Sequence, residues 1–388
     1  MACGGVESFI LSLGVYLQGK GCIVDIFATQ SPGKQFDEIS ENKMHGYSLT
    51  CSQYDIPILH ANKIATVLQK HKYNIIVINN CFLTQIIAGQ LPDESTVITM
   101  IHGNIDWLFQ QYLTNEEAIN LYIGISSAII TRARAILTKR EILYIPHGFD
   151  IPLETNRTSR DPPSRSQITL LFAGRLEDED KGVFLLPVIL ACLRNSGIIA
   201  TLRIAGSGSC QEQLLAKFEA CHVLEHVEML GYLSKYEIYE QYSEAHVLLF
   251  PSRNEGFGLS LIEAMAHGCV PVSSLIHGVT DGIITHGYDG LLTPIGNAQA
   301  FAEKVAMLCD CSKMWLAMSY AARNTVRDHF SFQKTGEHYW QIVTGAMKGL
   351  YTLPSARHLL PHYDLRLLRP RHFIPGWLLQ LYIRISAR

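Results

Sequence analysis

Charged residues are scarce in this sequence, and neither sign dominates. They make up 17% of the 388 residues, and the formal net charge is −3. A basic surface for nucleic acid is therefore not expected. The chain has no uninterrupted apolar run of about 20 residues. Its start also lacks a basic stretch followed by an apolar one. We therefore expect no membrane-spanning helix, no secretory signal and a cytoplasmic location.

Metal-binding and nucleophile motifs are also missing. The ten cysteines form no C-x-x-C pair, and Cys309 and Cys311 are too close together for a zinc site. Most lie in apolar runs, which indicates reduced core thiols. There is no G-x-x-x-x-G-K-[ST], no H-E-x-x-H, and no G-x-S-x-G around Ser207. We expect neither a metal nor a bound cofactor.

What is present is a regular alternation of β-branched runs with helical patterns. Hydrophobic residues make up 48%, enough to bury a core in each of two domains. The alternation predicts α/β units with parallel sheets. The expected strands are 22–28, 74–78, 97–101, 122–125 and 143–145 in the first half, then 168–173, 200–205, 227–230, 247–250, 270–273 and 291–293.

A change in composition marks the expected domain boundary. Residues 152–167 are rich in Pro, Ser, Arg and Asp and have no periodicity, as in a linker. The prediction is an N-terminal Rossmann-like domain at 1–150, a linker at 151–167 and a C-terminal Rossmann-like domain at 168–330. A helix at 331–350 should pack back toward the N-terminal domain, and 351–388 form a basic amphipathic tail.

The most informative stretch is EGFGLSLIE at 255–263. It follows a predicted strand, and a helix begins near Leu259. Gly256 and Gly258 suit a close backbone approach, and free N–H groups at a helix start favour a phosphate. Glu255 and Glu263 suit sugar or ribose hydroxyls instead. Spacing alone fits equally an ordinary strand–loop–helix with a capping acid.

Two cations follow the first strand of the second half. Arg175 comes directly after Gly174, and Lys181 lies six residues later. Together they can neutralise a diphosphate leaving group. Neighbouring Asp178, Glu179 and Asp180 leave a solvated turn as the alternative.

Two weaker signals lie in the first half. Gly4 and Gly5 precede the first expected helix, so their amides could face a ligand. His102 follows a strand and precedes Gly103, where it could meet a sugar hydroxyl or be a structural histidine.

Taken together, these motifs resemble glycosyltransferase family 4, retaining group 1 enzymes with the GT-B fold. The resemblance runs in order through GGVE, IHG, YIPHGFD, FAGRLEDEDKG, RIAGSGS, MLGYL, EGFGLSLIE and DGIITHGYDGLL. It implies two Rossmann-like domains with parallel sheets facing a central cleft, and transfer from a nucleoside diphosphate sugar without a metal.

The resemblance also implies a role for each site residue. Glu255 would contact the transferred sugar, Glu263 the ribose, and Arg175 and Lys181 the diphosphate. His102 would lie near the reaction centre. The donor would further be bound by Gly4, Gly5, Gly174, Gly231, Tyr232, Gly256, Phe257, Gly258 and Leu259. His102, Glu255, Arg175 and Lys181 form the expected catalytic set.

The sequence departs from the family pattern in three places. Only Met1, Ala2 and Cys3 precede the glycine pair, where the family has a central strand, so the neighbouring strands should be left unpaired. Thr280-Asp281-Gly282 replaces a Pro-Glu pair, which should alter a donor contact. His147 replaces a common Asn, which we expect to matter little.

Three functions remain open. The first is a transferase that builds a surface polysaccharide or glycolipid on a glycan, lipid-linked or small-molecule acceptor. The second is a non-catalytic nucleotide-sugar-binding or scaffold protein, and the third another enzyme on this fold, such as an epimerase or phosphorylase. The tail, with Arg357, Arg366, Arg369 and Arg371, would either bind the cytoplasmic face of a membrane or pack on the N-terminal domain.

Overall fold

The chain divides into two compact units, which are described one at a time. The structure is a computed structural model that describes residues 5–28, 39, 44–49, 57–150, 161–353, 357 and 379–385. Unit 1 comprises Cys3–Gly148 with Gln333–Arg388, and unit 2 comprises Phe149–Phe332. Both alternate strands with helices, which confirms the predicted α/β class. Most of the predicted linker, residues 151–160, lies outside the described residues.

Unit 2 contains a sheet whose strands all run parallel, in the order β12-β11-β10-β7-β8-β9. The strands are β7 (Ile168–Ala173), β8 (Ala200–Ala205), β9 (Val227–Gly231), β10 (Val247–Phe250), β11 (Val270–Ser274) and β12 (Leu291–Thr293). The chain runs outward from β7 through β8 and β9, then returns to β10 on its other side. This reversal is the switch point at which open α/β sheets bind ligands.

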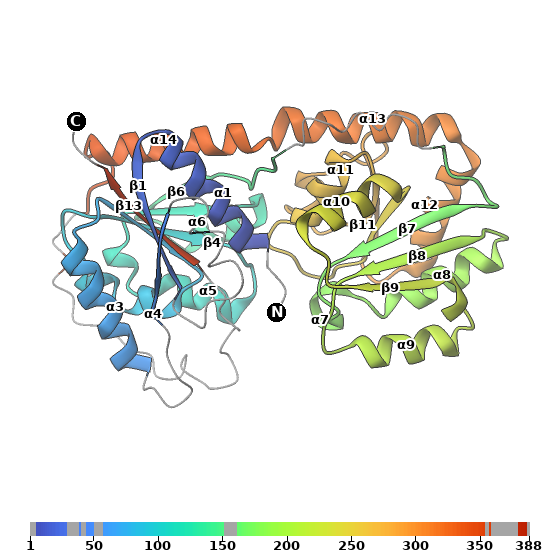
Figure 1. The fold of residues 1–388 in the computed structure, drawn as a ribbon, viewed down its shortest axis with the longest axis horizontal. Coiled ribbons are helices and arrows are strands. Elements are labelled where there is room, and N and C mark those ends of the chain that lie inside the picture. Colours follow the sequence, from blue (N-terminus) through green and yellow to red (C-terminus); the bar gives the residue numbers. More distant parts are fainter. Residues whose placement is uncertain are drawn as a thin grey trace. The chain divides into compact units, whose positions relative to one another are not determined.

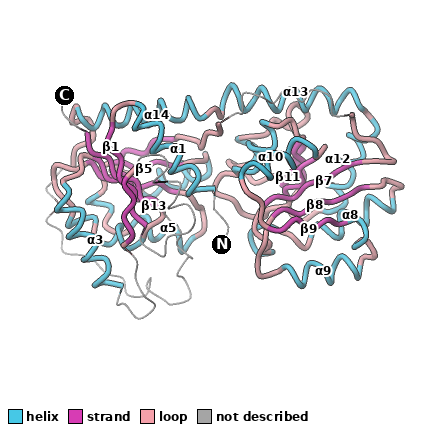
Figure 2. Tube along the Cα trace, viewed as in Figure 1, coloured by secondary structure: helices cyan, strands magenta, loops and turns pink. Residues whose placement is uncertain are grey.

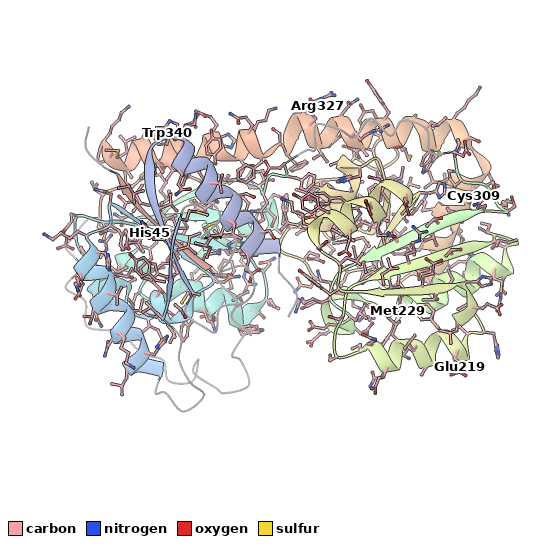
Figure 3. The ribbon with its side chains drawn as sticks, in the orientation of Figure 1. His45, Glu219, Met229, Cys309, Arg327 and Trp340 are labelled. Carbon is pink, nitrogen blue, oxygen red and sulfur yellow. The ribbon has the colours of Figure 1, made fainter. Side chains whose placement is uncertain are left out.

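Helices cover both faces of this sheet. They are α7 (Asp178–Lys181), α8 (Leu185–Asn195), α9 (Gln211–Ala220), α10 (Lys235–Glu244), α11 (Leu259–Ala266), α12 (Ala298–Asp310) and α13 (Ser312–His329), with 3-10 turns at Leu224–His226 and Thr280–Gly282. In Figure 1, α10 and α11 lie above the strands and α9 lies below. The core includes the fully buried Phe218 and Phe301. Met229 packs against it and Cys309 belongs to it (Figure 3).

Unit 1 has a seven-stranded sheet in the order β2-β1-β13-β3-β4-β5-β6. Its strands are β1 (Cys22–Ala28), β2 (His45–Ser48), β3 (Ile75–Asn79), β4 (Thr96–Ile101), β5 (Leu121–Gly124), β6 (Glu141–Tyr144) and β13 (Leu379–Ile385). Its helices are α1 (Gly5–Gly19), α3 (Pro57–His71), α4 (Phe82–Ile86), α5 (Asp106–Leu113), α6 (Ser127–Ile136) and α14 (Phe332–Met347), with 3-10 turns at Ala88–Gln90 and Glu116–Ala118.

Helix α14 packs tightly against α1. A Cβ atom on Gly336 would lie 2.8 Å from the Tyr16 ring, so only glycine lets the two helices approach this closely. Tyr16 donates a hydrogen bond to Glu337 at 3.0 Å, and Lys20 lies over the ring of Trp340, which Figure 3 labels. The segment after unit 2 thus contributes a helix to unit 1.

The C-terminal segment also contributes a strand. β13 pairs antiparallel with β1 from Leu379 to Ile385 and with β3 from Leu381 to Ile383. In Figure 1 it is the dark red arrow among blue and cyan strands, and Figure 2 shows it beside β1. The expectation of unpaired strands beside a missing central strand is therefore wrong. The other described strand pairs of unit 1 are parallel, as expected, and β13 runs against its two neighbours.

At Arg357, the expected basic tail packs on unit 1, in agreement with the second of its two expected alternatives. Arg357 is 3% exposed and donates hydrogen bonds to the carbonyl groups of Ala118 and Pro92. Burial lowers the pKa of Arg357 to about 10. Its guanidinium is used inside unit 1 and is withdrawn from any membrane surface. Residues 358–378, with the other arginines of the proposed membrane patch, lie outside the described residues.

Candidate functional site

The loops that follow β7 and β10 place a cation against a carboxylate at the switch point of unit 2. Lys181 Nζ lies 2.5 Å from Glu255 Oε1, and both side chains are largely buried, at 18% and 11% exposed. The Ser252 hydroxyl donates to the same carboxylate oxygen at 2.8 Å. Removing either partner would leave an uncompensated charge in a partly buried site.

The turn that carries Lys181 is fastened to the loop that carries Glu255. Gly182 has a positive φ of 61°, and a Cβ atom there would lie 2.3 Å from the carbonyl oxygen of Pro251. The Arg253 guanidinium lies 2.7 Å from Asp178 Oδ2, and Arg253 N donates to the carbonyl of Asp180 at 2.7 Å. Two of the three acids that suggested a solvated turn, Asp178 and Asp180, therefore hold the two loops together, while Glu179 is exposed. Sequence reasoning missed Gly182 and Arg253, although a glycine directly after the lysine was a usable signal.

Arg175 does not join this pair. Its side chain is 59% exposed and lies 2.7 Å from Glu177. The backbone beside it is fixed, because Gly174 N donates to Ala205 O at 3.0 Å. A Cβ atom on Gly206 would lie 1.9 Å from Gly174 O, so this approach also requires glycine.

The loop after β10 leads into the amino end of α11. Gly258 precedes the helix with a φ of 113°, and no side chain caps the first turn, which begins at Leu259. Phe257 is 4% exposed and packs edge-on against Phe330 at 5.9 Å. Gly256 completes the bend. The buried phenyl ring of Phe257 packs the loop in place, and backbone amides at a helix start suit a phosphate.

Glu263 lies one turn into α11 and is held by Tyr242 of α10. The Tyr242 hydroxyl donates to Glu263 Oε2 at 3.0 Å. Burial raises the pKa of Glu263, and the Tyr242 hydrogen bond opposes that rise. His267 lies on the next turn, its Nδ1 2.7 Å from the carbonyl oxygen of Glu263. Sequence reasoning found the glutamate and missed the tyrosine that positions it.

The end of β9 carries an exposed aromatic side chain. Gly231 has a φ of 67°, and its carbonyl accepts from Gly206 N at 2.7 Å. Tyr232 follows and is 55% exposed. Its ring is available for stacking on a flat ligand such as a base.

In unit 1, His102 follows β4 and is buried at 7% exposed. In the part of the chain that the structure describes, neither of its ring nitrogens has a hydrogen-bond partner. Burial lowers the pKa of His102 to about 3, which keeps the ring neutral. Its backbone N–H donates to the Tyr112 hydroxyl at 3.2 Å, and that hydroxyl donates to Asn80. Tyr112 and Asn80 were not found from the sequence.

A column of rings supports His102. His147 stacks on it with 5.3 Å between ring centroids and 18° between planes. Phe9 of α1 lies 4.1 Å from His147, and Tyr339 of α14 lies 5.9 Å from Phe9. His147 is 1% exposed and therefore fills a core position, so the expectation that it matters little deserves a direct test.

The remaining predicted residues are placed as follows. Gly5 is the first residue of α1, and Gly4 lies outside the described residues. Asp281, at the second departure from the family pattern, accepts from Gly278 N at 2.7 Å and so caps a local turn. Among the described residues, no three His, Cys, Asp or Glu side chains gather in a way that could hold a metal ion. No described helix is long and apolar enough to cross a membrane.

Comparison with known proteins shows what this site is similar to. Residues 155–325 match the family model described as glycosyl transferases group 1. The matched residues include the Lys181–Glu255 pair, the amino end of α11 and Glu263.

Relatives and solved structures extend the similarity. The chain is 30% identical over 228 residues to a glycogen synthase of Mycobacterium tuberculosis, covering 57% of this chain and only about half of that protein, 53%. It is 24% identical to a phosphatidyl-myo-inositol mannosyltransferase of Mycolicibacterium smegmatis, over 91% of each chain. Anabaena HepE, solved in complex with UDP and glucose, has a TM-score of 0.73 at 17% identity and covers 88% of this chain and 96% of HepE. These neighbours confirm the GT-B fold.

Proposed function

We propose that this protein is a retaining glycosyltransferase. It moves a sugar from a nucleoside diphosphate sugar to a glycan, lipid-linked or small-molecule acceptor in polysaccharide or glycolipid synthesis. The observation that carries the proposal is the Lys181–Glu255 pair, held at 2.5 Å on the two loops that flank the switch point of unit 2.

The pair supplies what a nucleotide sugar requires. On donor binding, Lys181 turns from Glu255 to the diphosphate, and Glu255 accepts hydrogen bonds from the sugar hydroxyls. The first amides of α11 add donors for the phosphate, and Glu263 accepts from the ribose. Arg175 is exposed, and its ion pair among the described residues is with its neighbour Glu177, so it can turn to the diphosphate at little cost.

The reaction breaks the bond between the anomeric carbon and the diphosphate oxygen. It forms a bond from that carbon to the acceptor oxygen on the same face, which retains the configuration. The acceptor proton goes to an oxygen of the departing diphosphate. Lys181 and Arg175 stabilise the negative charge that grows on the leaving group. His102, neutral and buried, offers a ring nitrogen to a sugar hydroxyl. No step in this scheme requires a metal.

A non-catalytic nucleotide-sugar-binding protein is the second candidate. The buried and internally neutralised Lys181–Glu255 pair favours the enzyme, because a binding protein could hold a diphosphate on exposed cations without burying a carboxylate beside them.

Donor hydrolysis and transfer separate the two candidates. Purified protein is mixed with UDP-, GDP- and ADP-sugars, with and without a chelator, and nucleoside diphosphate release is measured together with thermal shifts. We expect one base class to stabilise the protein and its sugar to be turned over with the chelator present. Lys181→Ala should lose both responses. A thermal shift without any turnover, across all acceptors tried, would favour the binding protein.

A further inference from the structure

The centre of the unit 1 sheet is completed by a strand from the far end of the chain. β1 and β3 are buried over nearly their whole length, and each pairs with β13 rather than with the other. If β13 were absent, both would present unpaired N–H and C=O groups in the middle of a buried sheet. A seven-residue ladder on one side and a three-residue ladder on the other satisfy those groups.

β13 has no short connection to either neighbour. Residues 348–378 separate it from the end of α14. Arg357 fastens this connecting segment to unit 1 through hydrogen bonds to the carbonyl groups of Ala118 and Pro92. The strand is also the one element of the described sheet that runs antiparallel to its neighbours. It is therefore a tethered segment that enters a gap from outside the βαβ succession.

We propose that the gap between β1 and β3 is an acceptor site for one extended peptide. Residues 379–385 are its tethered ligand, and a separate peptide of the same sequence binds in the same register once the tether is cut. Main-chain hydrogen bonds to β1 and β3 supply the affinity. The alternation of Leu379, Leu381, Ile383 and Ile385 with polar residues supplies the specificity.

The covalent connection through residues 348–378 explains why β13 of the intact chain is not displaced by a free peptide. Covalent attachment gives the segment an effective concentration on the order of a millimolar. A free peptide at lower concentration cannot compete with it. Cutting the connection removes that advantage, and the site then exchanges its occupant.

The first test determines the register of β13 against β1 in the intact protein, by disulfide formation with the native thiol of Cys22. Cys22 is directly paired with Ile385, and Ile23 with Arg384. Ile385→Cys should therefore form a disulfide with Cys22 within one molecule under oxidation at mildly alkaline pH. Arg384→Cys, whose register partner is Ile23, should not. Peptide mass spectrometry identifies the bond. Equal yields from both variants, no bond in either, or a bond between two molecules would overturn the proposal.

The second test measures exchange. A specific protease site is placed between residues 358 and 378, and the folded protein is cut. A labelled peptide of residues 379–388 should then bind with one-to-one stoichiometry, and the uncut protein should bind none at the same concentration. The same peptide carrying Tyr382→Pro should not bind, since proline removes a ladder donor. If the cut protein releases its own strand and takes up no peptide, or if both peptides bind equally, the proposal fails.

A third test uses the uncut chain, so that its result does not depend on whether the cut protein stays folded. Tyr382→Pro in the full chain should lower the melting temperature of unit 1, and the matched Tyr363→Pro, outside the strand, should lower it much less. Equal melting temperatures for Tyr382→Pro and the unaltered chain would contradict the proposal. Because none of these readouts involves a nucleotide sugar, their failure leaves the proposed transferase activity standing, and the reverse also holds.

Discussion

The two units share an α/β architecture and differ in how the central strands of their sheets are paired. In unit 2 the two strands at the switch point, β7 and β10, pair directly with each other. In unit 1 the corresponding strands β1 and β3 are separated by β13. The loops of unit 2 carry charges that neutralise one another, Lys181 on Glu255 and Arg253 on Asp178. The candidate residue of unit 1, His102, lies in a neutral stack of rings.

This difference indicates a division of labour. The ion pairs between the two linked loops of unit 2 keep the proposed donor site neutral while no charged ligand is bound. A buried column of neutral rings fixes the position of one side chain and is insensitive to charge. The first arrangement suits a diphosphate and the second suits a hydroxyl beside a reaction centre.

Glu255→Ala should have the largest effect on activity. It removes the proposed sugar contact and leaves Lys181 without its partner, so we expect transfer to fall about 100- to 1,000-fold, as for loss of one transition-state contact. Steady-state transfer kinetics measure this. Glu179→Ala removes an exposed acid of the neighbouring turn and should change little. Comparable losses in both variants would refute the assigned role of Glu255.

His147→Ala should break the ring column of unit 1. The lost packing should destabilise unit 1 by about 2–3 kcal/mol and lower the turnover number by roughly tenfold through a misplaced His102. His147→Phe retains a ring and should restore most of both. Calorimetry and a measurement of donor KM complete the test, because the donor affinity that we propose for unit 2 should stay constant. If His147→Phe were as impaired as His147→Ala, ring stacking at this position would not be what positions His102.

Gly182→Ala should loosen the fastening of the two charged loops in unit 2. The new Cβ would lie 2.3 Å from Pro251 O at a φ of 61°. We expect a loss of about 1–3 kcal/mol together with a raised donor KM. The control is Gly197→Ala, at a φ of 72° with no atom within 4 Å, which should lose stability alone. If the donor KM of Gly182→Ala were unchanged, the turn at Gly182 would have no part in donor binding.

The last comparison concerns pH, to which the stabilities of the two units should respond with opposite sign. Burial holds the pKa of His102 at about 3 and that of His147 well below 6.5, so the unfolded chain binds protons that folded unit 1 does not. Unit 1 should therefore lose stability as pH falls through the window from 6.5 toward 3. Burial raises the pKa of Glu263 above 4.5, so protonation as pH falls toward that value favours folded unit 2.

Calorimetry at several pH values distinguishes the two responses. His147→Phe removes one of the two histidines, and it should flatten the pH dependence of one transition only, which identifies that transition as unit 1. Parallel shifts of both transitions, or a dependence untouched by the substitution, would contradict the assignment.

Sequence periodicity predicted the interior parallel strands closely and the others poorly. Cys22–Ala28 and Ile168–Ala173 are mainly apolar runs, with one polar residue each (Asp25 and Thr169), and they form strands with the predicted bounds. His45–Ser48 is polar and short, so it carries no strand signal. Leu379–Ile385 alternates correctly, but prolines interrupt the residues before it, and its partner strands lie far away in sequence. A pairing of that kind depends on long-range contacts that local patterns do not encode.

The sequence predicted individual residues of the candidate site but not the contacts between them. Glu255 and Lys181 each stand after a strand, and the sequence revealed both. Their contact depends on β7 and β10 being neighbours, which follows from sheet order and not from spacing. The same limit hid Tyr242, because its hydroxyl meets Glu263 only after α10 and α11 have packed.

The position of β13 also orders events during synthesis. Unit 2 is one continuous stretch, Phe149–Phe332, whereas unit 1 is assembled from residues on both sides of it. As the chain leaves the ribosome, unit 2 can fold while β1 and β3 still lack the strand between them. The first unit to be translated is thus the last to be finished, and until Leu379–Ile385 arrives its open strands are the part of the newborn chain that a chaperone would need to shield.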